Sequence, residues 1–362
     1  MRLLLFNLVT DADDPFLGFG TRWITTLAQQ VEAIDVVTMR AGRLDVPANV
    51  RVYSVGKEKG YSELRRVGEF YRLLMPLLAN NQYDGCFAHM MPLFAVMAAP
   101  LLRIKKVPVV LWYAHKSVTP LLRIATWLVD RVVTSTRDGF RIQSPKVKMI
   151  GQGIEIERFV PTRDWNAGDR PFTLLTVGRL SPIKRLELLI EAVALIRQKS
   201  PELPLCLKIV GAPLGDTDQA YAAKLHQLIA QYHLQDTVVL VGNAPFPEVV
   251  TYYQQADCFV NVSETGSIDK AVLEAMSCGV PVIVKQVFAE VLGAELAQTW
   301  VTDSAPDQVA ERILLVASMP EPERRQLGEQ LRTIVVRDHA LEKLCGKIIA
   351  EIEDVLSKQH DT

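Results

Sequence analysis

Three charged side chains have the types and the order that binding of a phosphorylated, hydroxyl-rich ligand requires. Arg179 and Lys184 follow a predicted strand, and Glu274 lies about one turn into a predicted helix. Two cations between a strand end and a helix start can clamp a diphosphate. A carboxylate near a helix start can accept hydrogen bonds from vicinal hydroxyls, as the acidic residue of dinucleotide-binding folds does for ribose. On its own, an Arg and a Lys in a loop would mean little.

The elements that must position the glutamate form a strand, a turn, a helix and a second strand. Residues 258–262 are an apolar run typical of a buried strand, and residues 270–276 are strong helix formers without a breaker. A glycine and a proline then end the helix, and residues 280–284 predict a second short strand. The turn therefore presents backbone N–H groups at a helix N-terminus, which suits a phosphate. An ordinary βαβ unit with a surface glutamate would show the same pattern.

Two positions in the first half of the chain also follow predicted strands, where a ligand could bind. His115 follows the predicted strand 107–113, and side chains at strand C-termini face the ligand crevice of open α/β sheets. A lone His is usually a satisfied polar residue, but this place favours a functional role. Gly20 ends a polar loop between a first strand and a helix, where backbone can approach a ligand. Trp23 stands where a dinucleotide fingerprint needs Gly or Ala, so that motif is excluded.

Length and composition predict a globular protein of two domains. The chain has 362 residues, 49% of them apolar and 22% charged. Its longest apolar runs are about ten residues, far below the roughly 20 that a membrane helix needs, and no signal peptide is evident, so we expect a cytoplasmic protein. Five widely spaced Cys predict neither a zinc site nor a disulfide framework.

Charge is distributed unevenly along the chain. Residues 1–162 hold 21 Lys and Arg against 14 Asp and Glu, and the remainder holds 19 against 27. This asymmetry supports two domains with different partners. Two apolar-basic segments, 57–72 and 101–106, predict either solvated helix faces or contact with an anionic membrane. No basic stretch is interleaved with aromatic residues, so nucleic acid is not expected as a partner.

Strands alternate with helical segments throughout, which predicts an α/β fold with mostly parallel sheets. Further strands are expected at 35–39, 50–54, 84–88, 131–134, 147–150, 172–177, 205–210 and 238–242, and a helix at 62–79. Residues 161–171 are polar and rich in breakers, which is typical of a linker between domains.

Several motifs together resemble the retaining GT-B glycosyltransferases of family four. They are Val272-Leu273-Glu274-Ala275-Met276-Ser277-Cys278-Gly279-Val280-Pro281-Val282, Gly178-Arg179-Leu180-Ser181-Pro182-Ile183-Lys184-Arg185, Trp112-Tyr113-Ala114-His115-Lys116, and Gly151 to Phe159. The chain departs from the family pattern at two positions. Arg185 replaces the usual Gly of the diphosphate motif, and Gly266 stands where the family carries the first of two Glu residues.

The resemblance implies two Rossmann-like domains that face each other across a cleft. Residues 1–162 would be the acceptor-side domain, 163–171 the linker and 172–335 the nucleotide-sugar domain, while the C-terminal helix in 336–362 would pack back on the first domain. The implied reaction is sugar transfer from a nucleotide-diphosphate sugar to a glycan or lipid-linked acceptor. The anomeric configuration would be retained, with no cofactor and no essential metal.

The resemblance also assigns roles to residues. His115, Arg179 and Lys184 would be catalytic. The donor would be bound by Gly20, Gly178, Arg179, Lys184, Gly211, Ala244, Gly266, Ser267, Ile268, Asp269, Lys270 and Glu274. Because of Gly266, two alternatives remain open: a non-catalytic nucleotide-sugar-binding protein, and a nucleotide-sugar epimerase of the same fold.

Asp269 has two equally weighted interpretations. It stands just before the predicted helix, where Asp is a favoured N-cap, and it is also the nearest carboxylate that could replace the missing Glu in contacting the sugar. Gly266 offers no side chain for that contact, but it allows close backbone approach and positive φ. We therefore expect the turn from Thr265 to Lys270 to bind a sugar diphosphate through backbone amides.

Overall fold

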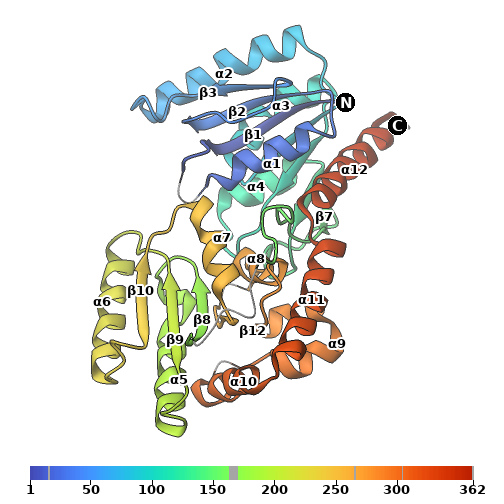
Figure 1. The fold of residues 1–362 in the computed structure, drawn as a ribbon. Coiled ribbons are helices and arrows are strands. Elements are labelled where there is room, and N and C mark those ends of the chain that lie inside the picture. Colours follow the sequence, from blue (N-terminus) through green and yellow to red (C-terminus); the bar gives the residue numbers. More distant parts are fainter. Residues whose placement is uncertain (15–16, 163–169, 265, 304, 361–362) are drawn as a thin grey trace. The chain divides into compact units, whose positions relative to one another are not determined.

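The computed structural model describes residues 1–14, 17–162, 170–264, 266–303 and 305–360. The chain divides into two compact units (Figure 1). The first unit comprises Met1–Gly153 together with Leu341–Thr362, and the second comprises Ile154–Ala340. The division thus falls before residue 162, the predicted end of the first domain, and the predicted linker lies outside the described residues except for Arg170 and Pro171.

The first unit contains a seven-stranded parallel sheet in the order β3-β2-β1-β4-β5-β6-β7. Its strands are β1 (Arg2–Thr10), β2 (Ala33–Ala41), β3 (Val50–Ser54), β4 (Gly85–His89), β5 (Val109–Trp112), β6 (Arg131–Thr134) and β7 (Val147–Met149). The order 3-2-1-4-5-6 is that of the Rossmann fold, in which ligands bind at the carboxyl ends of the strands.

Helices cover both faces of this sheet, because successive side chains of each strand alternate between the faces. Its helices are α1 (Phe19–Ala28), α2 (Glu63–Asn80), α3 (Pro92–Ile104), α4 (Pro120–Leu128) and α12 (Leu341–His360). Leu4 and Phe6 of β1 pack in one core with α2, α3 and α4, whereas Leu3 and Leu5 pack in the other with α1 and α12. The C-terminal helix is therefore an integral part of the first unit's core. No helix among the described residues combines the length and apolar character that crossing a membrane requires.

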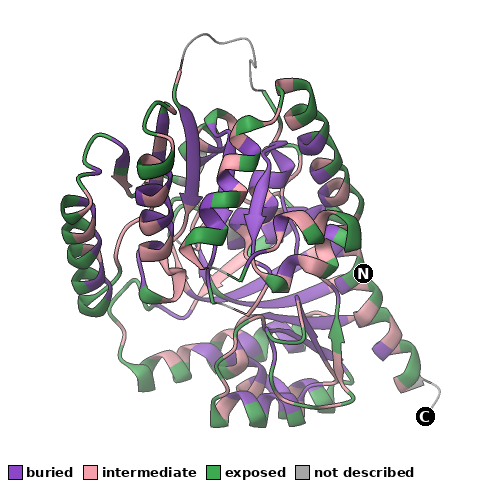
Figure 2. Cartoon of the chain, turned by 90° about the horizontal axis from the view of Figure 1, so that it is seen from below, coloured by how far each residue is buried: buried purple, intermediate pink, exposed green. Residues whose placement is uncertain are grey.

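The second unit repeats this arrangement with a five-stranded parallel sheet in the order β10-β9-β8-β11-β12. Its strands are β8 (Phe172–Val177), β9 (Leu205–Val210), β10 (Val238–Gly242), β11 (Cys258–Asn261) and β12 (Val282–Val284). Its helices are η1 (Pro182–Lys184), α5 (Leu186–Lys199), α6 (Asp216–Gln231), α7 (Phe246–Gln255), α8 (Lys270–Ser277), η2 (Gln286–Phe288), α9 (Ala289–Trp300), α10 (Pro306–Ser318) and α11 (Glu321–Asp338). Figure 2 shows the strands as largely buried and the outer helix faces as exposed. The predicted α/β fold with parallel sheets is confirmed.

The helix that carries Glu274 ends as a Schellman motif, which explains why the following strand is shorter than predicted. Gly279 adopts φ +71° and its N–H donates to the Met276 carbonyl at 3.0 Å. The Val280 N–H donates to the Ala275 carbonyl at 3.0 Å. Because residue 280 still serves the helix terminus, β12 begins only at Val282.

Candidate functional site

Three glycines end neighbouring strands of the second unit and bring their backbones close together. Gly178, Gly211 and Gly242 follow or end β8, β9 and β10, with φ values of +148°, +142° and +82°. The Gly211 N–H donates to the Gly242 carbonyl at 2.8 Å. A Cβ on Gly211 would lie 1.9 Å from the Gly178 carbonyl oxygen, so only glycine fits there. The carboxyl edge of this sheet, where ligands bind in such folds, is therefore built from half-buried backbone without side chains.

Lys184 reaches this edge and pairs with Asp269. A Cβ on Gly178 would lie 2.8 Å from the Lys184 Cε, so the glycine leaves room for the lysine chain. The Lys184 ammonium forms an ion pair with the Asp269 carboxylate. The same carboxylate accepts from the Asn261 Nδ2 at 3.0 Å and from the Ala271 N–H at 3.3 Å. Segments 85 positions apart in the sequence thus meet at one carboxylate.

The surroundings of Asp269 keep this carboxyl ionised. Burial alone would raise its pKa, but the charge of Lys184 and the hydrogen bonds from Lys184, Asn261 and Ala271 outweigh burial and lower the pKa. Of the two roles expected from the sequence, the structure shows the N-cap of α8. The structure also shows an ion pair with Lys184. The contacts from Lys184, Asn261 and Ala271 together use three of the roughly four acceptor positions of the carboxylate. A sugar contact by Asp269 stays a prediction.

Arg179 is held in the same way by a carboxylate from another helix. Its Nε lies 3.2 Å from the Oδ2 of Asp218, in the first turn of α6. Asp218 is buried and also accepts from the Leu214 N–H at 3.1 Å. The Arg179 side chain is 47% exposed, and this contact uses one of its five N–H donors. Both predicted cations are therefore oriented by carboxylates, and Arg179 is much more exposed than Lys184, whose side chain is 15% exposed.

Arg185, which replaces the family's usual glycine, keeps a glycine-like backbone. It adopts φ +51° and ψ +39°, the left-handed region, between η1 and α5. Its guanidinium pairs with Glu187 at 2.9 Å and with Glu264 at 2.5 Å. The Glu264 N–H also donates to the Ile183 carbonyl at 2.9 Å. These contacts tie η1 to the turn before α8, which compensates for the unfavourable backbone conformation.

We expect Arg185→Gly to change stability little and donor binding more. Glycine relieves about 1 kcal/mol of left-handed strain, and the lost ion pairs are exposed and contribute about 0–1 kcal/mol. The free energy of unfolding should therefore shift by less than about 1 kcal/mol. The donor dissociation constant should rise a few-fold because the two turns are no longer tied. Urea unfolding and calorimetry measure both quantities, and Arg325→Ala, at an exposed arginine of α11 in the second unit, is the control for loss of an arginine. Unchanged donor affinity in Arg185→Gly would contradict this prediction.

Glu274 is held by a tyrosine from a helix that the sequence analysis did not single out. The hydroxyl of Tyr253, which is fully buried in α7, donates to the Glu274 Oε2 at 2.8 Å. Burial raises the pKa of Glu274, while the bond from Tyr253 and the charge of Lys270 oppose the rise. Burial lowers the pKa of Lys270, and the charges of Glu274 and Glu155 oppose that change. Glu274 is thus a positioned, half-buried carboxyl whose environment favours its protonated form.

Tyr253→Phe should destabilise the second unit by about 1–2 kcal/mol, because Glu274 loses its buried donor while the ring volume is kept. We also expect a few-fold weaker binding of a nucleoside but no change for inorganic diphosphate, because Glu274 is assigned to the ribose. Tyr252→Phe, on the adjoining residue, is the matched control. Equal losses for nucleoside and diphosphate would argue against this assignment.

The remaining predicted donor-binding residues near α8 have few side-chain groups that could contact a ligand. Gly266 adopts φ +70°, Ser267 is half-buried, and the Ile268 side chain packs in the hydrophobic core. Ala244, in the loop after β10, packs against the same core. Thr265 lies outside the described residues. If these positions contact a ligand, they would therefore do so mainly through backbone groups.

The two predicted site residues of the first unit lie at the carboxyl edge of its own sheet. His115 is exposed in the loop after β5, and its Nδ1 accepts from the Ser117 N–H at 3.1 Å. In the neutral ring, the proton therefore sits on Nε2, which is then a hydrogen-bond donor. Gly20 lies in the first turn of α1, where a Cβ would come within 3.3 Å of the Val9 carbonyl oxygen.

Sequence reasoning missed Asp218, Tyr253 and Asn261. Asn261 had a usable signal, since it is a polar residue at the end of an apolar strand, as His115 is. Asp218 and Tyr253 sit on helices whose sequences show no motif, and only the fold brings them to Arg179 and Glu274.

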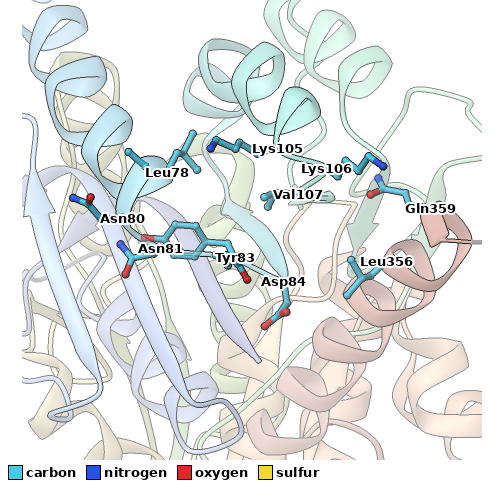
Figure 3. A pocket seen from close by; sticks show the side chains of 12 residues that line it. Leu78, Asn80, Asn81, Tyr83, Asp84, Lys105, Lys106, Val107, Leu356 and Gln359 are labelled. Atoms are coloured by element: carbon cyan, nitrogen blue, oxygen red, sulfur yellow. The ribbon is translucent and has the colours of Figure 1, made fainter.

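A cavity of about 910 Å³ lies elsewhere, at the amino edge of the first unit's sheet (Figure 3). Its lining includes Asn80, Tyr83, Lys105, Lys106 and Gln359 and none of the predicted site residues. The described residues contain no cluster of His, Cys, Asp or Glu arranged to hold a metal ion.

Comparison with known proteins connects the second unit to a family. Residues 162–333 match the model of glycosyl transferases group 1. This match covers Arg179, Lys184 and Glu274, and it supports the resemblance seen in the motifs.

Curated relatives match this chain over part of their length. A D-inositol 3-phosphate glycosyltransferase of Pseudarthrobacter chlorophenolicus is 29% identical over 148 residues, 39% of this chain and 34% of that protein. A putative colanic acid biosynthesis glycosyltransferase, WcaL of Escherichia coli, is 27% identical over 201 residues, 53% of this chain and 47% of that protein. The chain thus matches about a third to a half of the length of these relatives.

Solved structures match over nearly the whole chain. The Anabaena protein HepE in complex with UDP has a TM-score of 0.75 at 18% identity, covering 98% of this chain and all of that one. Sucrose-phosphate synthase from Thermosynechococcus elongatus has a TM-score of 0.73 at 18% identity, covering 99% of this chain and all of that one. The predicted GT-B fold class is confirmed.

Proposed function

We propose that this protein is a glycosyltransferase that moves a sugar from a nucleotide-diphosphate sugar to an acceptor with retention of configuration. One observation carries the proposal. Lys184 and Arg179 reach the carboxyl edge of the second unit's sheet, and Lys184 is tied to the start of the helix that bears Glu274. Two oriented cations next to a positioned carboxyl fit a nucleoside diphosphate.

The chemical task of such an enzyme is to stabilise a leaving diphosphate whose negative charge grows in the transition state. Lys184 and Arg179 would supply the compensating charge, and the ion pairs with Asp269 and Asp218 hold them in place beforehand. Preorientation matters because the cations then need no reorganisation when the sugar–phosphate bond breaks. The proposal assigns charge neutralisation to these two side chains and to the backbone at the start of α8, without an essential metal or cofactor.

The other assigned residues would bind the two ends of the donor. Glu274 would accept or donate hydrogen bonds to the ribose hydroxyls, while Gly211 and Ala244 would present backbone to the nucleobase. His115 would act at the sugar and the acceptor hydroxyl. None of these residues is an evident covalent nucleophile, so we propose front-side attack in which the leaving phosphate takes the acceptor proton.

The site supports the proposed donor class, and the names of the relatives support the proposed acceptor class. UDP is a reasonable first ligand because HepE was crystallised with UDP, and curated relatives include a colanic acid biosynthesis glycosyltransferase. We propose a glycan or lipid-linked acceptor and an enzyme that works in the cytoplasm, at the inner face of the membrane if the acceptor is lipid-linked.

The deciding experiment combines thermal-shift screening with a turnover assay. A nucleotide sugar present at 100 times its dissociation constant should add about 2.7 kcal/mol of stability. Donors that bind are then incubated with acceptors while released nucleoside diphosphate is measured, and the product anomer is assigned by NMR. Stabilisation without turnover of any sugar would instead indicate a non-catalytic binding protein. This alternative arises because Gly266 stands where the family has Glu. Acceptor-independent conversion of the sugar would indicate an epimerase.

A further inference from the structure

Several large apolar side chains of the first unit are exposed, Leu64 at 87% among them, and two of the most exposed lie on the neighbouring helices α3 and α4. Ile104, the last residue of α3, is 77% exposed, and Trp127, near the end of α4, is 74% exposed. The other tryptophans that the structure describes, Trp23, Trp112 and Trp300, are 2–4% exposed. Leaving an indole and a branched aliphatic chain in water forgoes the free energy that burial of their apolar area would release, so this pair fits a surface that a partner covers.

Basic residues surround these two side chains. No Asp or Glu occurs between Asp84 and Asp130, whereas this stretch contains five Lys or Arg. Six exposed residues form what we call the basic-apolar surface: Arg103, Ile104, Lys105, Lys106, Arg123 and Trp127. The nearest acid along the chain, Asp130, is half-buried and accepts from the Val109 N–H at 2.7 Å. Asp84 lines the same cavity as Lys105 and Lys106, and its carboxylate accepts from the Arg2 N–H at 2.6 Å. Basic residues thus outnumber acids at this surface.

The helices that carry this surface lie side by side on one face of the sheet. Side chains of α3 and α4 share one hydrophobic core and pack against each other. The Lys146 ammonium caps the end of α4 by donating to the Trp127 and Val129 carbonyls, each at 2.7 Å, and the charge of Arg103 at the end of α3 is close enough to affect it. Burial lowers the pKa of Lys146 and Arg103 lowers it further, against the effect of Asp130. Trp127 and Arg103 thus belong to one continuous patch.

We propose that the basic-apolar surface docks the protein on an anionic lipid bilayer. Trp is favoured at the membrane interface, where its ring is buried and its N–H remains hydrated. Lys and Arg beside it are attracted by the negative surface potential of anionic lipids. Lys105 and Lys106 are exposed and also line the cavity in Figure 3, so their ammonium groups are accessible to headgroups.

Charge complementarity selects a bilayer over a second copy of this chain. A symmetric dimer through this surface would place its basic residues against the same basic residues, which is unfavourable. A bilayer offers both requirements together, an apolar layer for Ile104 and Trp127 and a dense anionic layer for the cations.

The test is cosedimentation of the full chain with vesicles of phosphatidylglycerol or of phosphatidylcholine, without donor or acceptor. Binding should occur on the anionic vesicles at about 0.02 M salt and weaken strongly at about 0.5 M. Lys105→Glu with Lys106→Glu should reduce the binding constant at least about tenfold. The control, Lys199→Glu with Lys224→Glu, makes the same charge change on exposed lysines of the second unit and should leave binding unchanged.

Tryptophan fluorescence gives a second, site-specific readout. Vesicle binding should shift the emission to shorter wavelength, and Trp127→Phe should abolish the shift while most binding remains. Equal binding to neutral vesicles, equal loss in the control variant, or a shift that survives in Trp127→Phe would each overturn the proposal. So would a dimer in sedimentation velocity that Trp127→Ala abolishes. Because no sugar is transferred in these assays, their outcome is independent of the proposed activity.

Discussion

Lys184→Ala is expected to weaken binding of a nucleoside diphosphate by about 10- to 150-fold. The ammonium would make a charge-assisted contact to the diphosphate, and such contacts contribute about 1.5–3 kcal/mol. Turnover of the nucleotide sugar should fall at least as much, because the negative charge on the leaving group increases in the transition state. Calorimetry with UDP and a release assay measure the two effects, and Lys224→Ala on the exposed face of α6 is the control.

The ion pair with Asp269 gives the same variant a distinctive dependence on pH. The pKa of Asp269 is lowered in the folded protein, so its ionisation stabilises the fold above the unfolded value of about 3.9, and this stabilisation is lost as the pH falls through the folded pKa. In Lys184→Ala the main cause of the lowering is removed. The difference in unfolding free energy between the wild type and the variant should therefore be largest near neutral pH and shrink below about pH 4.

Asp269→Asn separates the cap from the ion pair. Asparagine caps a helix about as well as aspartate, so stability should change less than in Lys184→Ala, while the lysine loses its oriented partner. In a double-mutant cycle, the losses from Lys184→Ala and Asp269→Asn should not add. Additive losses in diphosphate binding, or unchanged affinity in Lys184→Ala itself, would remove the ion pair from the proposed site.

The local elements were predictable because each depends on neighbouring residues. The apolar run at 258–262 and the unbroken helix formers at 270–276 correspond to β11 (Cys258–Asn261) and α8 (Lys270–Ser277). Observed element ends differ from the predicted ones by one or two residues where hydrogen bonds that the sequence pattern does not reveal set the end. The Schellman motif after α8, because of which β12 begins two residues later than predicted, is an example. The parallel direction of the strands also followed, since alternating strands and helices favour parallel sheets, whereas the order of the strands became known only from the structure.

The partners within the site were not predictable from the same patterns. That Lys184 pairs with Asp269, Arg179 with Asp218 and Tyr253 with Glu274 depends on which helices the fold brings to one sheet edge. Spacing along the chain contains no information about such pairs. Arg185 illustrates the opposite case: the family pattern marked the position as glycine, and the left-handed backbone found there gives the physical reason.

His115→Ala is expected to lower turnover by about 10²- to 10⁴-fold while the donor dissociation constant changes less than about twofold. This is the size of effect seen when a positioned group acts on the reacting centre mainly in the transition state. The side chain is exposed at the carboxyl end of β5, and the Ser117 N–H occupies its Nδ1, leaving Nε2 as the group that can reach a ligand. His226→Ala, an exposed histidine on α6, controls for the loss of an imidazole.

His115→Gln distinguishes two ways in which the ring could act. The glutamine amide can donate a hydrogen bond but cannot take up or release a proton near neutral pH. If Nε2–H steadies the sugar or the acceptor hydroxyl as a donor, His115→Gln should recover a substantial part of the turnover lost in His115→Ala. If the ring transfers a proton, both variants should be equally slow. Near-normal turnover in a folded His115→Ala protein would show instead that this histidine lies outside the reaction centre, and the proposed front-side attack would then depend on the leaving diphosphate and the two cations alone.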